Sequence, residues 1–145
     1  RETMASLNTK LPITELKAIL EAMNFFAKVS VGKVEDLVTE TILPSIYVTL
    51  DSDINENNGQ MRTDGGEYNR ILIVTLQIHL DQTNEDDLYY LDVRDMVESA
   101  ILKDSLLWQS VIDRDVVGSR WDKGQNLPRK QGEMALRLFT RGCVV

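Results

Sequence analysis

The chain is poor in cysteine, histidine and proline, and it lacks a long apolar segment. Its 145 residues include one cysteine, Cys143, one histidine and three prolines. One cysteine cannot form a disulfide within the chain, and the spacing of a structural zinc site is missing. No apolar run approaches the roughly 20 residues of a transmembrane helix, so we expect no membrane association. The N-terminal segment lacks the hydrophobic region of a signal peptide, and we therefore expect folding in a reducing cytoplasm.

The composition is typical of one soluble domain. Hydrophobic residues make up 43% of the chain and charged residues 27%, both ordinary values. We predict a single domain over residues 1–145, with mobile loops at about 51–67 and 118–132, where the chain is polar and rich in glycine. The 16 Lys and Arg residues against 23 Asp and Glu residues give a net charge of −7, which argues against indiscriminate DNA binding.

The charge is unevenly distributed along the chain. Residues 1–113 hold 9 basic and 20 acidic residues, a net charge of −11, whereas residues 114–145 hold 7 basic and 3 acidic residues, a net charge of +4. Such a protein can neutralise itself internally. Alternatively, it can present unlike charges on two faces, which favours head-to-tail self-association because unlike patches steer and register a contact.

Hydrophobic periodicity predicts an α+β fold, with a mixed or antiparallel sheet of about four to five strands flanked by two main helices. Pro12 suits the first turn of a helix, and Asn84 can cap the start of another. We also expect the Leu-Leu-Trp segment at 106–108 to form a short turn that plugs one end of the core. The expected helices lie at 12–26 and 84–103, and the expected strands at 29–31, 45–51, 70–81, 111–117 and 134–140.

Three features of the sequence could indicate a metal site or a catalytic side chain, but each lacks a residue or neighbour that such a site requires. The acidic run from Asp51 resembles the start of an EF-hand calcium loop, but its sixth position is Glu56 instead of glycine and its twelfth is Arg62 instead of glutamate. His79 is the single histidine, and we interpret it as a hydrogen-bonded side chain on a strand face. Cys143 has no activating neighbour and is interpreted as a small apolar residue of the last strand. We therefore predict no cofactor and no metal.

The enzyme alternative is a small magnesium-dependent nuclease acting on phage or branched DNA. Asp51 and Asp113 could supply its acids. However, the strand after the first loop carries Gln77 and His79 where such nucleases place a Glu-x-Lys pair. That replacement removes both a metal ligand and a cation, so we predict that the protein is not an enzyme.

The two tryptophans have different interpretations. Trp121 lies between Arg120 and Lys123, as in a groove that stacks and binds nucleic acid. Tryptophan and arginine are also enriched in the hot spots of protein interfaces. Because the whole chain is acidic, we favour the interface. Trp108 follows two leucines and is expected in the core.

The order of these elements resembles a known family. The chain has an amphipathic helix, a short strand, a strand that opens with Leu-Pro-Ser-Ile-Tyr-Val at 43–48, a polar loop and a second strand at 71–80. A helix ending in Val-Glu-Ser-Ala-Ile-Leu-Lys-Asp-Ser-Leu-Leu-Trp at 97–108 and two C-terminal strands follow. Over roughly residues 10–142 this layout resembles the tail terminator, or tail-completion, proteins of long-tailed bacteriophages, the group that includes minor tail protein U.

The resemblance implies a structural virion protein of the tail neck, assembled in the host bacterial cytoplasm. It implies a homo-hexameric ring that caps the tail tube, ends tube polymerisation and offers a surface to the head connector, with genome DNA close by in the lumen. Its partners would be further copies of itself, the tail-tube protein and the head-connector or neck protein. Another neck or tail-tube protein, and an adaptor module unrelated to phages, remain alternatives.

We predict two groups of partner-binding residues. The first would form the subunit or connector contact, and the second would lie in the loop that touches the tail tube or its lumen. The first group is Arg120, Trp121, Lys123, Arg129 and Lys130, and the second is Asp51, Asp53, Arg62 and Asp64.

Overall fold

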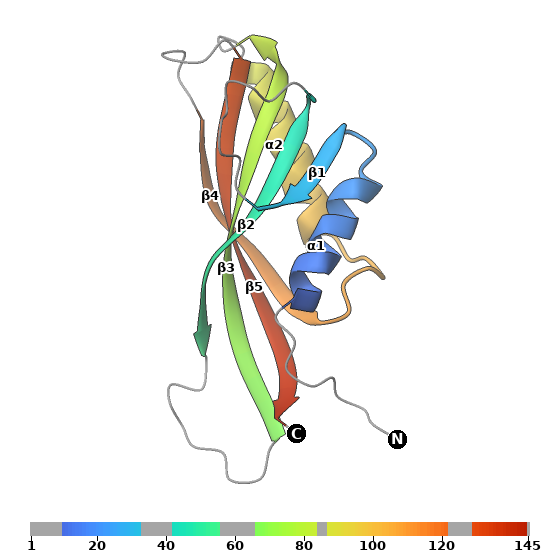
Figure 1. The fold of residues 1–145 in the computed structure, drawn as a ribbon, viewed down its shortest axis with the longest axis vertical. Helices are drawn as coiled ribbons and strands as arrows, with labels where there is room; N and C mark the ends of the chain where they lie inside the picture. Colours follow the sequence, from blue (N-terminus) through green and yellow to red (C-terminus); the bar gives the residue numbers. More distant parts are fainter. Residues whose placement is uncertain (1–9, 33–41, 56–65, 84–86, 122–128, 145) are drawn as a thin grey trace.

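The computed structural model describes residues 10–32, 42–55, 66–83, 87–121 and 129–144, and it has an α+β fold (Figure 1). The predicted fold class, a mixed sheet with two helices, is confirmed. The elements in chain order are α1 (Lys10–Ala22), β1 (Lys28–Val31), β2 (Ser45–Asn55), β3 (Gly66–Thr83), α2 (Asp87–Leu102), β4 (Val111–Trp121) and β5 (Arg129–Val144).

The strands form one sheet in the order β1-β2-β3-β5-β4. β1 runs parallel to β2, and the other neighbouring strands are antiparallel. The longest pairing joins β3 to β5, from Gly66 opposite Val144 to Thr83 opposite Arg129. β3 and β5 therefore form the middle of the sheet, while β1 and β4 form its described edges.

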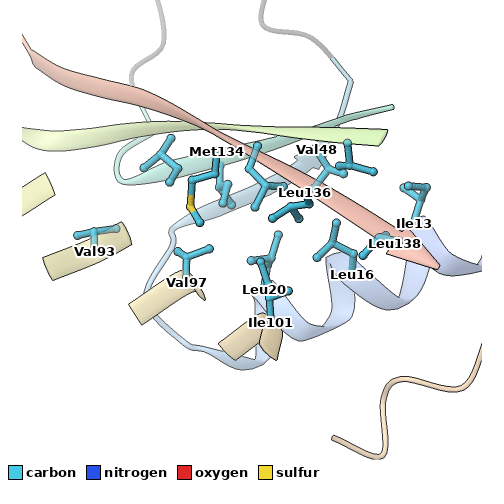
Figure 2. Packing of buried hydrophobic residues seen from close by; sticks show 14 of the residues in the cluster. Ile13, Leu16, Leu20, Val48, Val93, Val97, Ile101, Met134, Leu136 and Leu138 are labelled. Carbon is cyan, nitrogen blue, oxygen red and sulfur yellow. The ribbon is translucent and has the colours of Figure 1, made fainter. Parts of the chain in front are cut away.

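Both helices pack on one face of the sheet (Figure 1), and the core lies between them and the strands. Alternate residues along a strand point to opposite faces, and in β3 the even-numbered residues 72–80 are fully buried. In Figure 2 the helix side chains Leu16, Leu20, Val97 and Ile101 point toward Met134, Leu136 and Leu138 of β5.

The first helix ends earlier than its apolar period suggests. Asn24 has a positive φ of 56°, a conformation that asparagine tolerates better than most residues. The apolar period predicts a helix as far as Phe26, but α1 ends at Ala22. Phe26 therefore lies outside the helix. Instead, the rings of Phe25 and Phe26 pack edge to face with centroids 5.0 Å apart.

The buried face of α2 is rotated from the predicted one. The prediction placed Tyr89 and Met96 on the core face: Tyr89 does pack against the core and is partly buried, but Met96 is 41% exposed, and Tyr90, which was not predicted there, is fully buried. Val93 and Val97 are buried as predicted, together with Ile101. The apolar stripe thus begins one residue later than we expected.

The prediction that the turn at 106–108 plugs the core is wrong for both leucines. Leu106 is 94% exposed and Leu107 is 41% exposed. Only Trp108 packs against the core, and its Nε1 donates to the carbonyl oxygen of Ile101 at 3.2 Å. Since Trp108 occupies the space at the end of α2, the leucines are left outside.

The predicted loop boundaries are also wrong. Residues 51–55 continue β2, where Asp53 lies opposite Leu72, and 66–67 begin β3. Residues 118–121 and 129–132 belong to β4 and β5, with Trp121 opposite Gly132. Residues 51–54 are exposed, so their pairing with β3 needs no apolar alternation. Residues 56–65 and 122–128 lie outside the described ranges.

Candidate interaction surface

The face of the sheet opposite the helices is a candidate interaction surface of the described chain. Figure 1 shows α1 and α2 on the same side, so neither of the two described helices covers this face. It is formed by the odd-numbered residues of β3 and β5, such as Ile73, Thr75 and Ala135, which are neither fully buried nor fully exposed. An antiparallel sheet tolerates one solvated face, and half-exposed apolar residues on it are suited to a protein contact.

An ion pair divides this face into two hollows. Arg120 of β4 lies opposite Glu133 of β5, and its Nε and Nη2 donate to Glu133 Oε1 at 3.1 and 2.9 Å. The Arg120 side chain is 84% exposed. Because both hollows are lined partly by this pair, the two residues form a polar ridge between them.

The first hollow, which we call the β4–β5 hollow, measures about 330 Å³ and is built from small side chains. A Cβ added at Gly118 would meet no atom within 4 Å, so the glycine itself leaves the space open. Besides Arg120 and Glu133, the hollow is lined by Thr75, Gly118, Ser119, Met134 and Ala135.

The second hollow, of about 250 Å³, is polar, with His79 and two amides in its lining. Gln77 Oε1 and Gln131 Oε1 are buried and accept no hydrogen bond from any part of the chain that the structure describes. His79 is 1% exposed and meets the ring of Tyr47 edge to face, with centroids 5.8 Å apart. The interpretation of His79 as a strand-face residue agrees with this position.

The predicted contact residues of the C-terminal segment are not all surface residues. Lys130 is fully buried, and its Nζ contacts the Asp87 carboxylate at the start of α2. It therefore cannot serve as a surface contact, because even-numbered residues of β5 face the helices. Trp121 is half-buried and packs on Tyr90, with ring centroids 5.4 Å apart. Lys123 and the side chain of Arg129 lie outside the described residues.

The predicted tail-tube group is divided between strand and undescribed chain. Asp51 accepts a hydrogen bond from the Thr75 hydroxyl, and Asp53 pairs with Arg70 at 3.2 Å. Both aspartates thus lie on β2 rather than in a loop. Arg62 and Asp64 fall outside the described residues, so nothing places them beside the aspartates.

The two acids of the nuclease alternative do not form one site. Asp51 lies on β2 and Asp113 on β4, with β3 and β5 between them. Three spacings of roughly 4.8 Å separate these strands by about 14 Å, whereas paired catalytic metals lie about 4 Å apart. Within the described ranges, no three His, Cys, Asp or Glu side chains gather as metal ligands would.

The basic charge of the C-terminal segment is neutralised locally where the structure describes it. Arg137 contacts Asp115, and Arg120 contacts Glu133, within the segment itself. Arg114 lies 3.7 Å from Asp104. Of the two interpretations of the charge distribution, internal neutralisation is therefore the one that these residues follow.

A second surface, which the sequence analysis missed, is the turn between α2 and β4. Leu106 stands almost fully in solvent at its tip, although the turn is well ordered by hydrogen bonds. The Arg114 guanidinium donates to the carbonyl oxygens of residues 101, 102 and 103 at 2.6 to 3.0 Å. Glu15 of α1 accepts from the backbone N–H of Gln109 and Ser110 at 3.1 and 3.0 Å. No pattern in the Leu-Leu-Trp segment indicates which side chain turns outward.

Comparison with known proteins finds no family model and no curated sequence that matches this chain. Within the described ranges, neither helix has the length and apolar character to cross a membrane.

Proposed function

We propose that the chain is a structural subunit that joins head to tail with copies of itself into a ring, and that this ring caps the tail tube of a long-tailed bacteriophage. The ring ends tube polymerisation and offers a surface to the head connector. The resemblance of residues 10–142 to tail terminator proteins supports the phage assignment. The surfaces of the subunit support the self-assembly.

The observation that carries the proposal is the pairing of two unlike surfaces on one small subunit. One is the hollowed sheet face over β3, β5 and β4, and the other is the turn that holds Leu106 in solvent. A ring needs heterologous contacts, in which each subunit uses two different patches. Leu106 is 94% exposed, and Leu102 and Leu107 of the same turn region are 42% and 41% exposed, so the turn presents a group of apolar side chains that a contact would remove from water.

The charge distribution contributes less to this proposal than the sequence alone suggested. Arg120 and Arg137 already have acidic partners within their own subunit. Shape therefore supports the assembly more strongly than net charge does. The nuclease alternative has no comparable support, because Asp51 and Asp113 lie on strands separated by two others.

The test is the oligomeric state in solution and on tail tubes. Size-exclusion chromatography with light scattering and native mass spectrometry would be run over a wide concentration range, followed by negative-stain microscopy. We expect a cyclic oligomer of six copies, and we expect purified subunits to stop the elongation of tail tubes. A strict monomer that also fails to bind tube ends would overturn the proposal. So would Mg²⁺-dependent DNA cleavage that is lost in Asp51→Asn or Asp113→Asn.

A further inference from the structure

We infer that Leu106 of one subunit inserts into the β4–β5 hollow of the next subunit, and that this contact builds the ring. The inference rests on the proposed function and names the residues of its subunit interface. Four observations support it. Leu106 is an apolar side chain on a well-held turn, and the β4–β5 hollow is open. Charged side chains border both surfaces, and the two surfaces lie too far apart within one subunit to contact each other.

The turn that carries Leu106 is held in place before any partner binds. Ser105 closes the turn, since its Oγ accepts from the Leu107 N–H at 3.1 Å and its carbonyl oxygen accepts from the Trp108 N–H at 3.2 Å. The Arg114 guanidinium lies over the Trp108 ring, 5.3 Å from its centroid, and also binds the carbonyl end of α2. A side chain on such a turn loses little further backbone freedom when it binds, which favours affinity.

The β4–β5 hollow fits a leucine side chain in size and chemistry. An apolar cavity of about 150 Å³ holds a benzene molecule, and this open hollow measures about 330 Å³. Gly118 and Ala135 supply small walls, and a Cβ at Gly118 would meet no atom within 4 Å, so there is space above the strand. The volume of the hollow is therefore sufficient for the four carbon atoms of a leucine side chain, with the polar Arg120–Glu133 pair at its rim.

The charges beside the two surfaces are complementary. Lys103 and Asp104 precede the turn tip, and the Asp104 side chain is fully exposed. At the rim of the hollow stand Arg120 and Glu133. When Leu106 enters the hollow, Asp104 can exchange Arg114 of its own subunit for Arg120 of the neighbouring copy, and Lys103 can join Arg120 as a partner of Glu133. Such rim pairs set the register of a contact more than its strength.

One subunit cannot join its own two surfaces. The turn directly precedes Val111 at the start of β4, and Gly118 lies seven residues further along the same strand. At about 3.4 Å per residue, these positions are roughly 24 Å apart. Figure 1 shows the chain after α2 on the helix side, while β4 runs from there across the sheet toward the top of the view, away from the turn. The contact is therefore between copies, and it is heterologous, as a ring requires.

The first experiment removes each half of the contact. Leu106→Asp places a charge at the tip of the turn, and Gly118→Leu places a side chain in the hollow at a position where a Cβ meets no atom within 4 Å. We expect each change to raise the concentration for half-assembly at least tenfold, measured by light scattering, with the thermal unfolding midpoint unchanged. Leu88→Asp is the matched control, because Leu88 is 75% exposed on α2 and lies outside the contact; it should assemble like the wild type.

A charge exchange tests the register of the contact. Asp104→Arg and Arg120→Asp should each weaken assembly, because each places like charges together across the interface. The double variant restores the opposite pair and should recover most of the assembly. Additive losses in the double variant would show that these two residues do not meet and would overturn this register.

Cysteine cross-linking identifies the partners directly. In a Cys143→Ser background, a mixture of Leu106→Cys and Ala135→Cys proteins should give a disulfide-linked pair under mild oxidation, and neither protein should give one alone. A pair formed by Leu106→Cys alone would indicate a symmetric contact and overturn the inference. If the wild type forms rings but Leu106→Asp and Gly118→Leu form them equally well, the inference fails and the proposed function stands. If the wild type forms no ring, in solution or on tail tubes, both fail.

Discussion

The ring of Tyr90, at the start of α2, lies directly over Gly132 of β5: a Cβ at position 132 would stand 2.4 Å from three atoms of the phenol. Tyr90 is fully buried, so its ring cannot move aside into solvent. The glycine therefore provides the space in which α2 meets the sheet, next to the hollow lined by Gln77 and Gln131.

Substitution of Gly132 should accordingly destabilise the protein. We expect Gly132→Ala to lower the free energy of unfolding by about 1–3 kcal/mol, the usual cost of overpacking a core. Gly118→Ala is the matched control, since a Cβ there meets nothing within 4 Å, and it should be neutral or stabilise by up to about 1 kcal/mol. Urea unfolding of both variants measures the difference. Equal stability of Gly132→Ala and the wild type would contradict this packing.

The sequence predicts the parts of the fold that depend on local periodicity. The alternation from Leu72 to Leu80 and the helical spacing of Val93 and Val97 are visible in the chain and place the core correctly. The extension of β2 past Asp51 is not visible, because its residues are polar and their strand conformation depends on pairing with β3. Local pattern alone therefore underestimates strands at solvent-exposed positions.

The candidate site was harder to predict because it depends on contacts between distant residues. The turn that carries Leu106 is held in part by Glu15, which accepts a hydrogen bond from the chain 95 positions later at Ser110. The β4–β5 hollow likewise depends on the register that sets Gly118 opposite Ala135. Arg120 was predicted at a contact surface from its charge, and it lies at the rim of that hollow.

Loss of the Glu15 carboxylate should loosen the turn that carries Leu106. Glu15 is 7% exposed and accepts hydrogen bonds from Gln109 N, Ser110 N and Ser110 Oγ. Glu15→Ala leaves these donors unpaired and should cost about 1–3 kcal/mol. Glu15→Gln keeps one acceptor oxygen and should cost less. Hydrogen exchange at the Ser110 amide should speed up in step with these losses.

The control for this prediction lies on the same helix. Glu21 is exposed and pairs with Lys17 at 3.8 Å across one helical turn, so Glu21→Ala should change stability by no more than about 0.5 kcal/mol. If Glu15→Ala and Glu21→Ala behave alike, the buried carboxylate does not hold the turn.

Removing the Asp87 carboxylate should destabilise the protein more than removing the charge of Lys130. Lys130 is fully buried, while the side chain of its partner Asp87 is 56% exposed. Asp87→Ala leaves an ammonium group buried without that carboxylate and should destabilise by about 1–3 kcal/mol, less than for a fully buried pair because water reaches the site. Lys130→Met removes the charge and keeps most of the volume, so it should cost less than Asp87→Ala. If Lys130→Met loses more stability than Asp87→Ala, the contact between Lys130 and Asp87 stabilises the folded state by more than the neutralisation of a buried charge.

Tyr90 should make the protein less stable at high pH. Burial raises the pKa of Tyr90 from 10.0 to about 12, so between these values the unfolded chain has lost the phenolic proton while the folded chain keeps it. The unfolded state then binds fewer protons, and the free energy of unfolding falls as pH rises. This part of the stability is complete below pH 10 and is lost as pH rises toward 12, at no more than about 1.4 kcal/mol per pH unit.

Tyr90→Phe isolates this effect from other groups that titrate in the same range. Its hydroxyl makes a long 3.5 Å hydrogen bond to the Arg120 carbonyl, so at pH 8 the variant should lie within about 1 kcal/mol of the wild type. Between pH 10 and 12 the wild type should lose more stability than the variant, measured by urea unfolding at each pH. Phenolate absorbance should show one of the four tyrosines titrating late in the wild type and that step missing in Tyr90→Phe. If the stability curves of the two proteins run parallel between pH 10 and 12, Tyr90 titrates in the folded state as it does in the unfolded chain. The raised pKa assigned to the buried phenol would then be wrong.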